Sequence, residues 1–255
     1  MLQRKEYITV PLSTEQDVLR FFNKADSLII FDIGACEGED SIKYSRLFPN
    51  AKVHAFEPVP KNIKIAEENL KTYEAAHVKL TPVALSNKIG KQVLNVSSGR
   101  PEDADAREDW DYGNKSSSLL PPDEVLATHK WLKFTEQIEV QTDTLSNYCS
   151  TNKIDCIDFI HMDVQGAELI VLEGAGNFIT NIKAIWLEVS DIAMYKNQPL
   201  RKDLENFMKD HNFRLYKSIV HDKFGDQFYI NKKYFPGFVY SLPHLKARLK
   251  RLLRF

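Results

Sequence analysis

The sequence predicts an open α/β fold, with a mostly parallel sheet and helices on both faces. An apolar run at residues 27–31 stops at Asp32 and turns through Gly34 and Gly38, as a buried strand, a tight turn and a helix start would. A second apolar stretch, residues 53–56, ends in the same way on Glu57. The chain has 255 residues and 43% hydrophobic content, which suits one large core. We therefore expect a single domain.

The remaining elements follow from periodicity. Ser13 and Gln16 have capping-box spacing, so we expect a short helix within an N-terminal cover, residues 1–27. A third parallel strand is expected within residues 78–86, followed by a hairpin strand at 92–96. Further strands are expected at residues 138–142, 157–163 and 184–189, with a helix over 166–175. Strands at 213–220 and 227–230 flank a turn at Gly225, and so short a connection predicts that the last strand runs antiparallel.

Composition excludes several classes of protein. The net charge of −1 gives no general attraction to nucleic acid,. Cys36, Cys149 and Cys156 are odd in number and lack C-x-x-C spacing, so neither a disulfide framework nor a zinc site is indicated. The first residues have no apolar core of signal-peptide length, and no later run approaches 18 apolar residues,. We expect a soluble, cytoplasmic protein with reduced thiols.

The glycine turn favours a nucleoside without a pyrophosphate. Its spacing is G-x-x-x-G, and Cys36 occupies the place where a dinucleotide site needs a glycine,. The acids of the loop, Asp32, Glu37, Glu39 and Asp40, would each repel a phosphate by up to ~4 kcal/mol at 4 Å, whereas a helix N-terminus returns only ~0.3–1 kcal/mol. A ligand with a sulfonium and an ammonium would be attracted instead. S-adenosylmethionine has these groups.

Glu57 supports a nucleoside site. It lies 25 positions after Asp32, since 57 − 32 = 25, and an acid about 20 residues further on in a βαβ unit accepts hydrogen bonds from ribose hydroxyls. Each motif alone also fits an ordinary strand-to-helix turn. Two alternatives stay open at this point: an NAD-dependent oxidoreductase and a scaffold that binds S-adenosylmethionine without catalysis.

The assembled motifs resemble the FkbM family of S-adenosylmethionine-dependent methyltransferases. The resemblance lies in residues 31–38, 54–58, 83–86, 116–119 and 162–169. It implies the class I methyltransferase (Rossmann-like) fold, with a seven-stranded sheet in the order 3-2-1-4-5-7-6, and O-methylation of a sugar, glycan or other natural-product hydroxyl. The cofactor-binding residues that it implies are Asp32, Gly34, Ala35, Glu37, Gly38, Glu57, Pro58, Val83, Ala84 and Asp163.

The candidate catalytic residues are Asp163, Glu188 and His161, at or near the ends of strands. Methyl transfer needs an aligned acceptor oxygen and a group that removes its proton. Asp163 is our first choice of base, although it could instead cap the next helix or contact the cofactor. For His161, a buried, hydrogen-bonded core histidine is the favoured alternative. We assign no metal, because the weaker alternative of magnesium on Asp163, Glu188 and Asp191 lacks diagnostic spacing.

Two segments fall outside the regular pattern. Residues 99–134 lack periodicity, and long loops in compact domains are commonly lids or binding loops. Within them Ser116, Ser117 and Ser118 precede an apolar pair, so we expect this loop to bind the acceptor substrate. The tail at residues 243–255 is basic with leucines at helical intervals, which is typical of a frayed end or of peripheral membrane contact. The sequence leaves the oligomeric state open.

Overall fold

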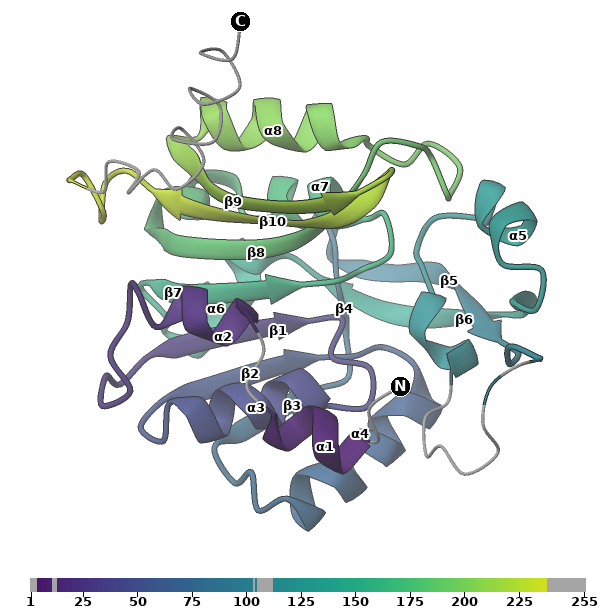
Figure 1. Cartoon of the computed structure of the whole chain (residues 1–255), viewed down its shortest axis with the longest axis horizontal. Helices are drawn as coiled ribbons and strands as arrows, with labels where there is room; N and C mark the ends of the chain where they lie inside the picture. The colour runs from purple at the N-terminus through teal and green to yellow at the C-terminus, as the bar shows by residue number, and fades with distance from the viewer. Residues whose placement is uncertain (1–3, 11–12, 103, 105–111, 238–255) are drawn as a thin grey trace, which may run out of the picture.

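The computed structural model describes residues 4–10, 13–102, 104 and 112–237, and a seven-stranded sheet forms its centre (Figure 1). The strands, in their order across the sheet, are β3 (Val78–Thr81), β2 (Lys52–Phe56), β1 (Ile29–Ile33), β7 (Ile157–Met162), β8 (Ile182–Ser190), β10 (Phe224–Asn231) and β9 (Phe213–His221). β10 pairs antiparallel with β8 and β9, and the other pairs are parallel. The expected fold and strand order are confirmed.

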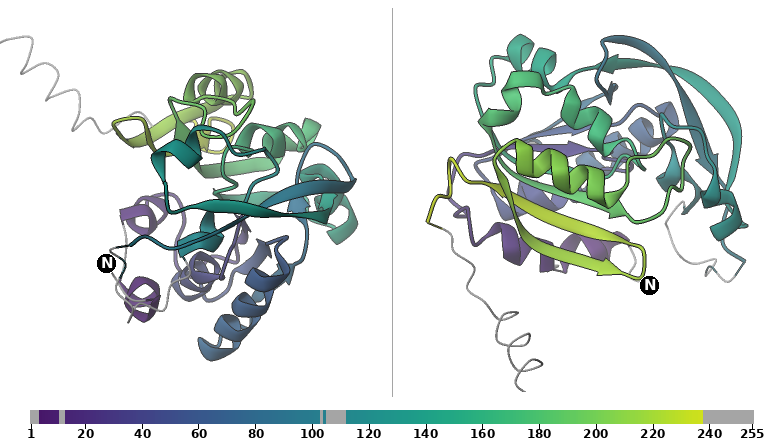
Figure 2. Two further views of the ribbon diagram at one scale, coloured as in Figure 1. Left: turned by 90° about the vertical axis from the view of Figure 1, so that its right-hand side faces the viewer. Right: turned by 90° about the horizontal axis from the view of Figure 1, so that it is seen from above.

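Helices cover both faces of this sheet (Figure 2). One face carries α1 (Arg4–Thr9), α2 (Ser13–Val18), α3 (Glu39–Leu47) and α4 (Pro60–Thr72). The other face carries α6 (Leu145–Asn152), α7 (Glu168–Glu173), the 3-10 helix η2 (Gly176–Asn181) and α8 (Arg201–Asp210). Periodicity indicated α2 but not α1. Within the described residues, no helix combines the length and the apolar character that crossing a bilayer requires.

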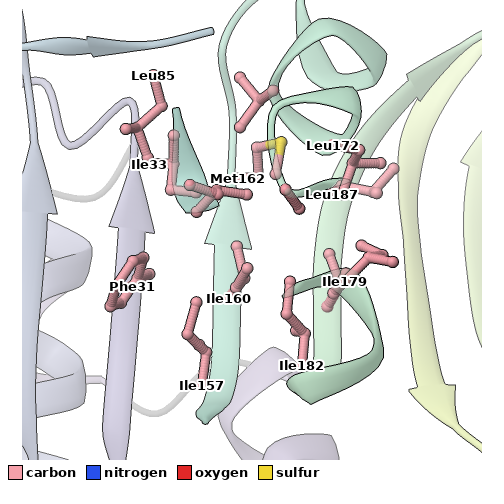
Figure 3. Close-up of a cluster of buried hydrophobic side chains, with 14 of the residues drawn as sticks. Phe31, Ile33, Leu85, Ile157, Ile160, Met162, Leu172, Ile179, Ile182 and Leu187 are labelled. Carbon is pink, nitrogen blue, oxygen red and sulfur yellow. The ribbon is translucent and has the colours of Figure 1, made fainter. Parts of the chain in front are cut away.

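The largest buried apolar cluster lies where the central strands meet the layer of α6, α7, η2 and α8, and a second one lies on the opposite face of the sheet. Figure 3 shows Phe31 of β1, Ile160 and Met162 of β7 and Leu187 of β8 in one apolar cluster with Leu172 of α7. All five side chains are at most 1% exposed, and each such burial stabilises the fold by about 1.5–3 kcal/mol. This packing fixes the positions at which β1, β7 and β8 end.

A second sheet lies beside the carboxyl ends of the parallel strands (Figure 1). Its order is β4 (Ala84–Leu85), β6 (Lys133–Asp143) and β5 (Gly90–Ser98). The expected strand over residues 78–86 is therefore wrong as one element, because Pro82 follows the end of β3 and cannot donate to a ladder. β5 does not pair with β3 but runs antiparallel to β6.

The described residues of the region 99–134 contain more regular structure than expected. It holds the 3-10 helix η1 (Tyr112–Ser116), α5 (Glu124–Thr128) and the start of β6. The helix expected over residues 166–175 is shorter, because α7 ends at Glu173. The basic tail, residues 243–255, lies outside the described residues.

Substituting Gly34 tests how closely the turn after β1 approaches the Asp163 carbonyl. Gly34 has φ +88, and a Cβ there would lie 1.8 Å from the Asp163 carbonyl oxygen. Gly38 has nearly the same φ, +84, but its nearest neighbour would be Ala66 Cβ at 3.5 Å. Both alanine variants carry backbone strain of about 1–3 kcal/mol. We expect Gly34→Ala to lose about 1–3 kcal/mol more in the free energy of unfolding than Gly38→Ala, owing to overpacking. Equal losses in urea denaturation would contradict this contact.

Candidate active site

A pocket opens at the carboxyl ends of β1, β2 and β7, and we call it the strand-end pocket. Of the residues predicted to bind a cofactor, six line it: Gly34, Glu57, Pro58, Val83, Ala84 and Asp163. The other four, Asp32, Ala35, Glu37 and Gly38, are not in its lining. The opposite side is closed by residues 112–119, which we call the wall segment; its residues 114, 115 and 117–119 reach the lining.

Glu57 is held rigidly at the pocket. Its carboxylate accepts hydrogen bonds from the backbone N–H groups of Cys36 at 2.9 Å and Val59 at 2.8 Å, and from Asn62 Nδ2 at 3.4 Å. Burial raises the pKa of Glu57 to about 7, although these hydrogen bonds oppose the shift. A fixed carboxylate in a lining of apolar side chains is suited to accept hydrogen bonds from a diol.

The acids of the glycine loop have partners within the protein and are not in the pocket lining. Glu37 is 1% exposed, ion-pairs with Arg4 of α1 and accepts a hydrogen bond from Asn114 Nδ2 at 2.8 Å. Asp32 accepts a hydrogen bond of 2.5 Å from Ser41, and Asp40 accepts one of 2.8 Å from the Tyr7 hydroxyl. That these acids surround the ligand stays a prediction. Glu57 and Asp163 are the acidic side chains of the lining among the described residues.

The three serines hold the wall segment in place. The backbone N–H of Ser116 donates to Ser97 Oγ at 3.0 Å, and Ser117 Oγ accepts from the backbone N–H of Ser97 at 3.0 Å. Ser118 Oγ donates to the Gln165 carbonyl at 2.8 Å and accepts from Leu120 N at 3.0 Å. Only Ser117 and Ser118 line the pocket. Their hydroxyls therefore already have partners inside the protein.

A chain of hydrogen bonds joins the acids at the ends of β7 and β8. Gln165 Nε2 donates to Asp163 Oδ1 at 2.6 Å and approaches Glu188 Oε2 at 3.4 Å. Tyr195 donates its hydroxyl to the Ser116 carbonyl at 2.8 Å and approaches Gln165 Oε1 at 3.2 Å. Burial, together with the negative charges of Asp163 and Glu168, raises the pKa of Glu188 well above its ordinary value. A carboxylate with a raised pKa is a better proton acceptor near neutral pH.

Glu168 completes an acidic cluster with these two residues. Carboxylate oxygens of Asp163, Glu168 and Glu188 lie within 4.8 Å of one another. Glu168 Oε1, however, accepts the backbone N–H groups of Val164 at 3.1 Å and Gly166 at 3.2 Å, so it stabilises the turn before α7. Asp191, the third acid of the magnesium alternative, is instead held by Arg201 through hydrogen bonds of 2.8 and 2.7 Å.

His161 lies behind the pocket and not in its lining. Its Nδ1 is 3.5 Å from Asp32 Oδ1, and its ring packs edge-on against Tyr44. Burial lowers the pKa of His161, but the contact with Asp32 and the charges of Asp40 and Asp163 outweigh it and raise the pKa to about 9. A protonated imidazole cannot accept a proton, so His161 does not fit the role of general base at neutral pH.

Sequence reasoning missed several residues of this site, among them Arg4, Asn114, Lys115 and Tyr195. Asn114 and Lys115 line the pocket, and their position directly before the three serines was an available signal. Arg4 and Tyr195 lie 33 and 30 residues from their partners Glu37 and Gln165, and no local pattern reveals such pairs.

The fold and the strand-end pocket define a class I methyltransferase. The strand order matches that class, and an acid fixed at the end of β2 borders a pocket without phosphate-binding glycines. The sequence pattern of the "Methyltransferase FkbM domain" matches residues 32–215. The chain belongs to the FkbM methyltransferase family, and its methyl donor is S-adenosylmethionine.

Individual relatives agree with this assignment. The chain is 34% identical over 198 residues to the 2-O-methyltransferase NoeI of Sinorhizobium fredii, covering 77% of each protein. It is 25% identical over 201 residues to the methyltransferase sdnD of Sordaria araneosa, covering 75% of each. Among solved structures, the METTL16 methyltransferase domain matches with a TM-score of 0.50 at 9% identity, covering 89% of this chain and 67% of that one. This last likeness concerns the fold alone.

The contact between His161 and Asp32 predicts a pH dependence of stability. The pKa of His161 rises from 6.5 to about 9 on folding, so the contact stabilises fully below pH 6.5 and is lost as pH rises through about 9. We expect the wild type to lose roughly 2–3 kcal/mol relative to His161→Gln between pH 6 and pH 9.5, at 1.36 kcal/mol per pKa unit. Urea denaturation of both proteins at several pH values measures this difference in the free energy of unfolding.

The exposed His77 supplies the control for this experiment. His77→Gln should follow the wild-type pH profile. Parallel profiles for the wild type and His161→Gln would show that folding does not raise the pKa of His161.

Proposed function

We propose that this chain transfers the methyl group of S-adenosylmethionine to a hydroxyl of a sugar, a glycan or another small natural product. The observation that carries this proposal is the position of Asp163, which lines the strand-end pocket and shares Gln165 with Glu188. The pocket proposed for the cofactor therefore lies next to two acids that could accept a proton. The name of the relative NoeI, a 2-O-methyltransferase, supports oxygen as the acceptor atom.

The lining residues fit the cofactor. We place its ribose at Glu57, its adenine near Pro58, Val83 and Ala84, and its methionine part along Gly34. The Glu57 carboxylate is oriented by backbone N–H groups, so it needs no rearrangement to accept hydrogen bonds from the ribose hydroxyls. Asp32, Ala35, Glu37 and Gly38 support the glycine loop from behind in this arrangement.

Within this proposal, Asp163 and Glu188 remove the acceptor proton. S-adenosylmethionine supplies an electrophilic methyl group, so the protein has chiefly to align the acceptor oxygen. Gln165 fixes Asp163 through a hydrogen bond of 2.6 Å, and the raised pKa of Glu188 favours uptake of a proton. A proton shared by the two acids relieves their mutual repulsion.

The acceptor itself binds beyond the acids in this proposal. The hydroxyls of Ser117 and Ser118 are engaged within the wall segment, so we assign these serines, with Ser116, to shaping the acceptor side. Residues 243–255 would add membrane contact for a lipid-linked acceptor. If deleting residues 243–255 leaves co-sedimentation with anionic liposomes unchanged, the proposed membrane contact is wrong.

Transfer of labelled methyl groups tests the proposed reaction. Purified protein, labelled S-adenosylmethionine and a panel of neutral oligosaccharides and lipid-linked glycans should yield a labelled methyl ether. A protein that binds S-adenosylhomocysteine but labels no hydroxyl in any fraction would instead be a non-catalytic scaffold.

Replacing the two acids separates catalysis from binding. We expect Asp163→Asn and Glu188→Gln to lower kcat by about 10²–10⁴, the usual contribution of general base catalysis, and to change the cofactor Kd by less than about threefold. Glu139→Gln is the control, because Glu139 is 61% exposed and pairs with Lys91. A retained kcat together with a weakened Kd would make Asp163 and Glu188 binding residues.

Glu57→Gln tests the ribose contact by calorimetry. We expect the Kd of S-adenosylhomocysteine to rise about 10- to 100-fold, the usual range for a lost hydrogen bond to a charged group. The wild type should discriminate against the 2′-deoxyribose analogue, and the variant should bind both ligands alike. Equal discrimination by both proteins would remove Glu57 from this role.

A further inference from the structure

The strand-end pocket contains a cation that the proposed reaction does not use. Lys115 lies in η1 and is the only lysine or arginine among the described residues of the pocket lining. The acids of the lining are Glu57 and Asp163. A negatively charged ligand group in this pocket would thus meet two carboxylates and one ammonium.

Hydrogen bonds on both sides hold the backbone at Lys115. Before it, Asn114 Nδ2 donates to Glu37 at 2.8 Å, and the Asn114 carbonyl accepts from Asn62 Nδ2 at 3.4 Å. After it, the Ser116 carbonyl accepts the Tyr195 hydroxyl at 2.8 Å. The Lys115 side chain therefore projects from a backbone position that is fixed within the wall segment.

The charge of Lys115 acts at the glycine-loop end of the pocket. Its Nζ lies 3.9 Å from Glu39 Oε1, the limit of an ion pair, while Arg4 Nε lies 3.2 Å from the same oxygen. Its charge also acts on the Cys36 thiol and on Asp163. Cys36 and Asp163 belong to the pocket lining, whereas Glu39 does not. The ammonium of Lys115 therefore acts on lining residues in the turn after β1 and at the end of β7.

The cofactor has one anionic group. The α-carboxylate of S-adenosylmethionine is at the end remote from adenine, and near Asp163 it would be repelled without a cation. Burial lowers the pKa of Lys115, but the charges of Glu39 and Glu37 outweigh it and raise the pKa. Lys115 is therefore protonated at neutral pH.

We infer that Lys115 binds the α-carboxylate of the cofactor and thereby selects ligands that carry the complete amino-acid end. This inference rests on the proposed placement of the cofactor in the strand-end pocket. It assigns to the wall segment a direct role in recognising the methyl donor, in addition to its proposed role on the acceptor side.

Two ligands without a transferable methyl group test the inference by calorimetry. S-adenosylhomocysteine carries the α-carboxylate, and its decarboxylated analogue, S-adenosyl-3-thiopropylamine, keeps the ammonium but lacks the carboxylate. For Lys115→Met, we expect the Kd of S-adenosylhomocysteine to rise about tenfold or more, while the Kd of the analogue changes by less than about twofold. Lys115→Arg should stay within about threefold of the wild type for both ligands.

Lys91→Met is the matched control, because Lys91 lies on β5 and pairs with the exposed Glu139 at 2.6 Å. It should leave both Kd values unchanged. Melting temperatures without ligand report whether each variant folds.

Two results would overturn the inference. If Lys115→Met raises the Kd of both ligands equally, Lys115 has a structural role in the wall segment. If the Kd of S-adenosylhomocysteine is unchanged, Lys115 interacts with Glu39 and does not contact the ligand. Failure of the proposed cofactor placement is a separate result: the wild type would then bind neither ligand, or Glu57→Gln would bind both as the wild type does.

Discussion

The close approach of the β1 turn to the end of β7 sets the geometry of the whole site. The backbone N–H of Asp163 donates to the Ile33 carbonyl at 3.0 Å. The backbone segments that continue β1 and β7 therefore remain paired for one residue beyond the end of β7. Gly34 lies against the Asp163 carbonyl, where no side chain fits. The same contact thus fixes the floor of the cofactor pocket and the acid beside it. Glu168 then holds the turn after Asp163 through two backbone N–H groups.

The charges around the glycine loop are divided between two sides. Behind the loop, the positive charge of Arg4 neutralises the charges of Glu37 and Glu39. These acids therefore stabilise the loop and attract a charged ligand only weakly. On the pocket side, the lining carries the acids Glu57 and Asp163 and the cation Lys115. A zwitterionic ligand with a sulfonium matches a pocket that carries both signs of charge. The short helix α1 therefore contributes to the site without touching the pocket.

Local patterns were sufficient to predict the main sheet and the acids at its strand ends, because each motif is a run of neighbouring residues. They were not sufficient for the second sheet, since β5 pairs with β6 across the intervening residues 99–132. The roles of Ser117 and Ser118 could not be predicted either, because a hydroxyl can bond to a ligand or to the backbone with equal ease. His161 was placed on the correct strand, but its protonation depends on Asp32 of the neighbouring strand.

The wall segment belongs to the small sheet and not to the main one, which has a consequence for chimeric enzymes. It is tied to β5 through Ser97 and to the loop after β8 through Tyr195. An exchange of the wall segment between relatives, made to broaden the range of acceptors, would on the proposed cofactor placement also replace residues that bind the methyl donor. Screens at saturating donor concentration would overlook that second change. Titrating the donor as well as the acceptor would distinguish a chimera with altered acceptor selectivity from one that binds the methyl donor poorly.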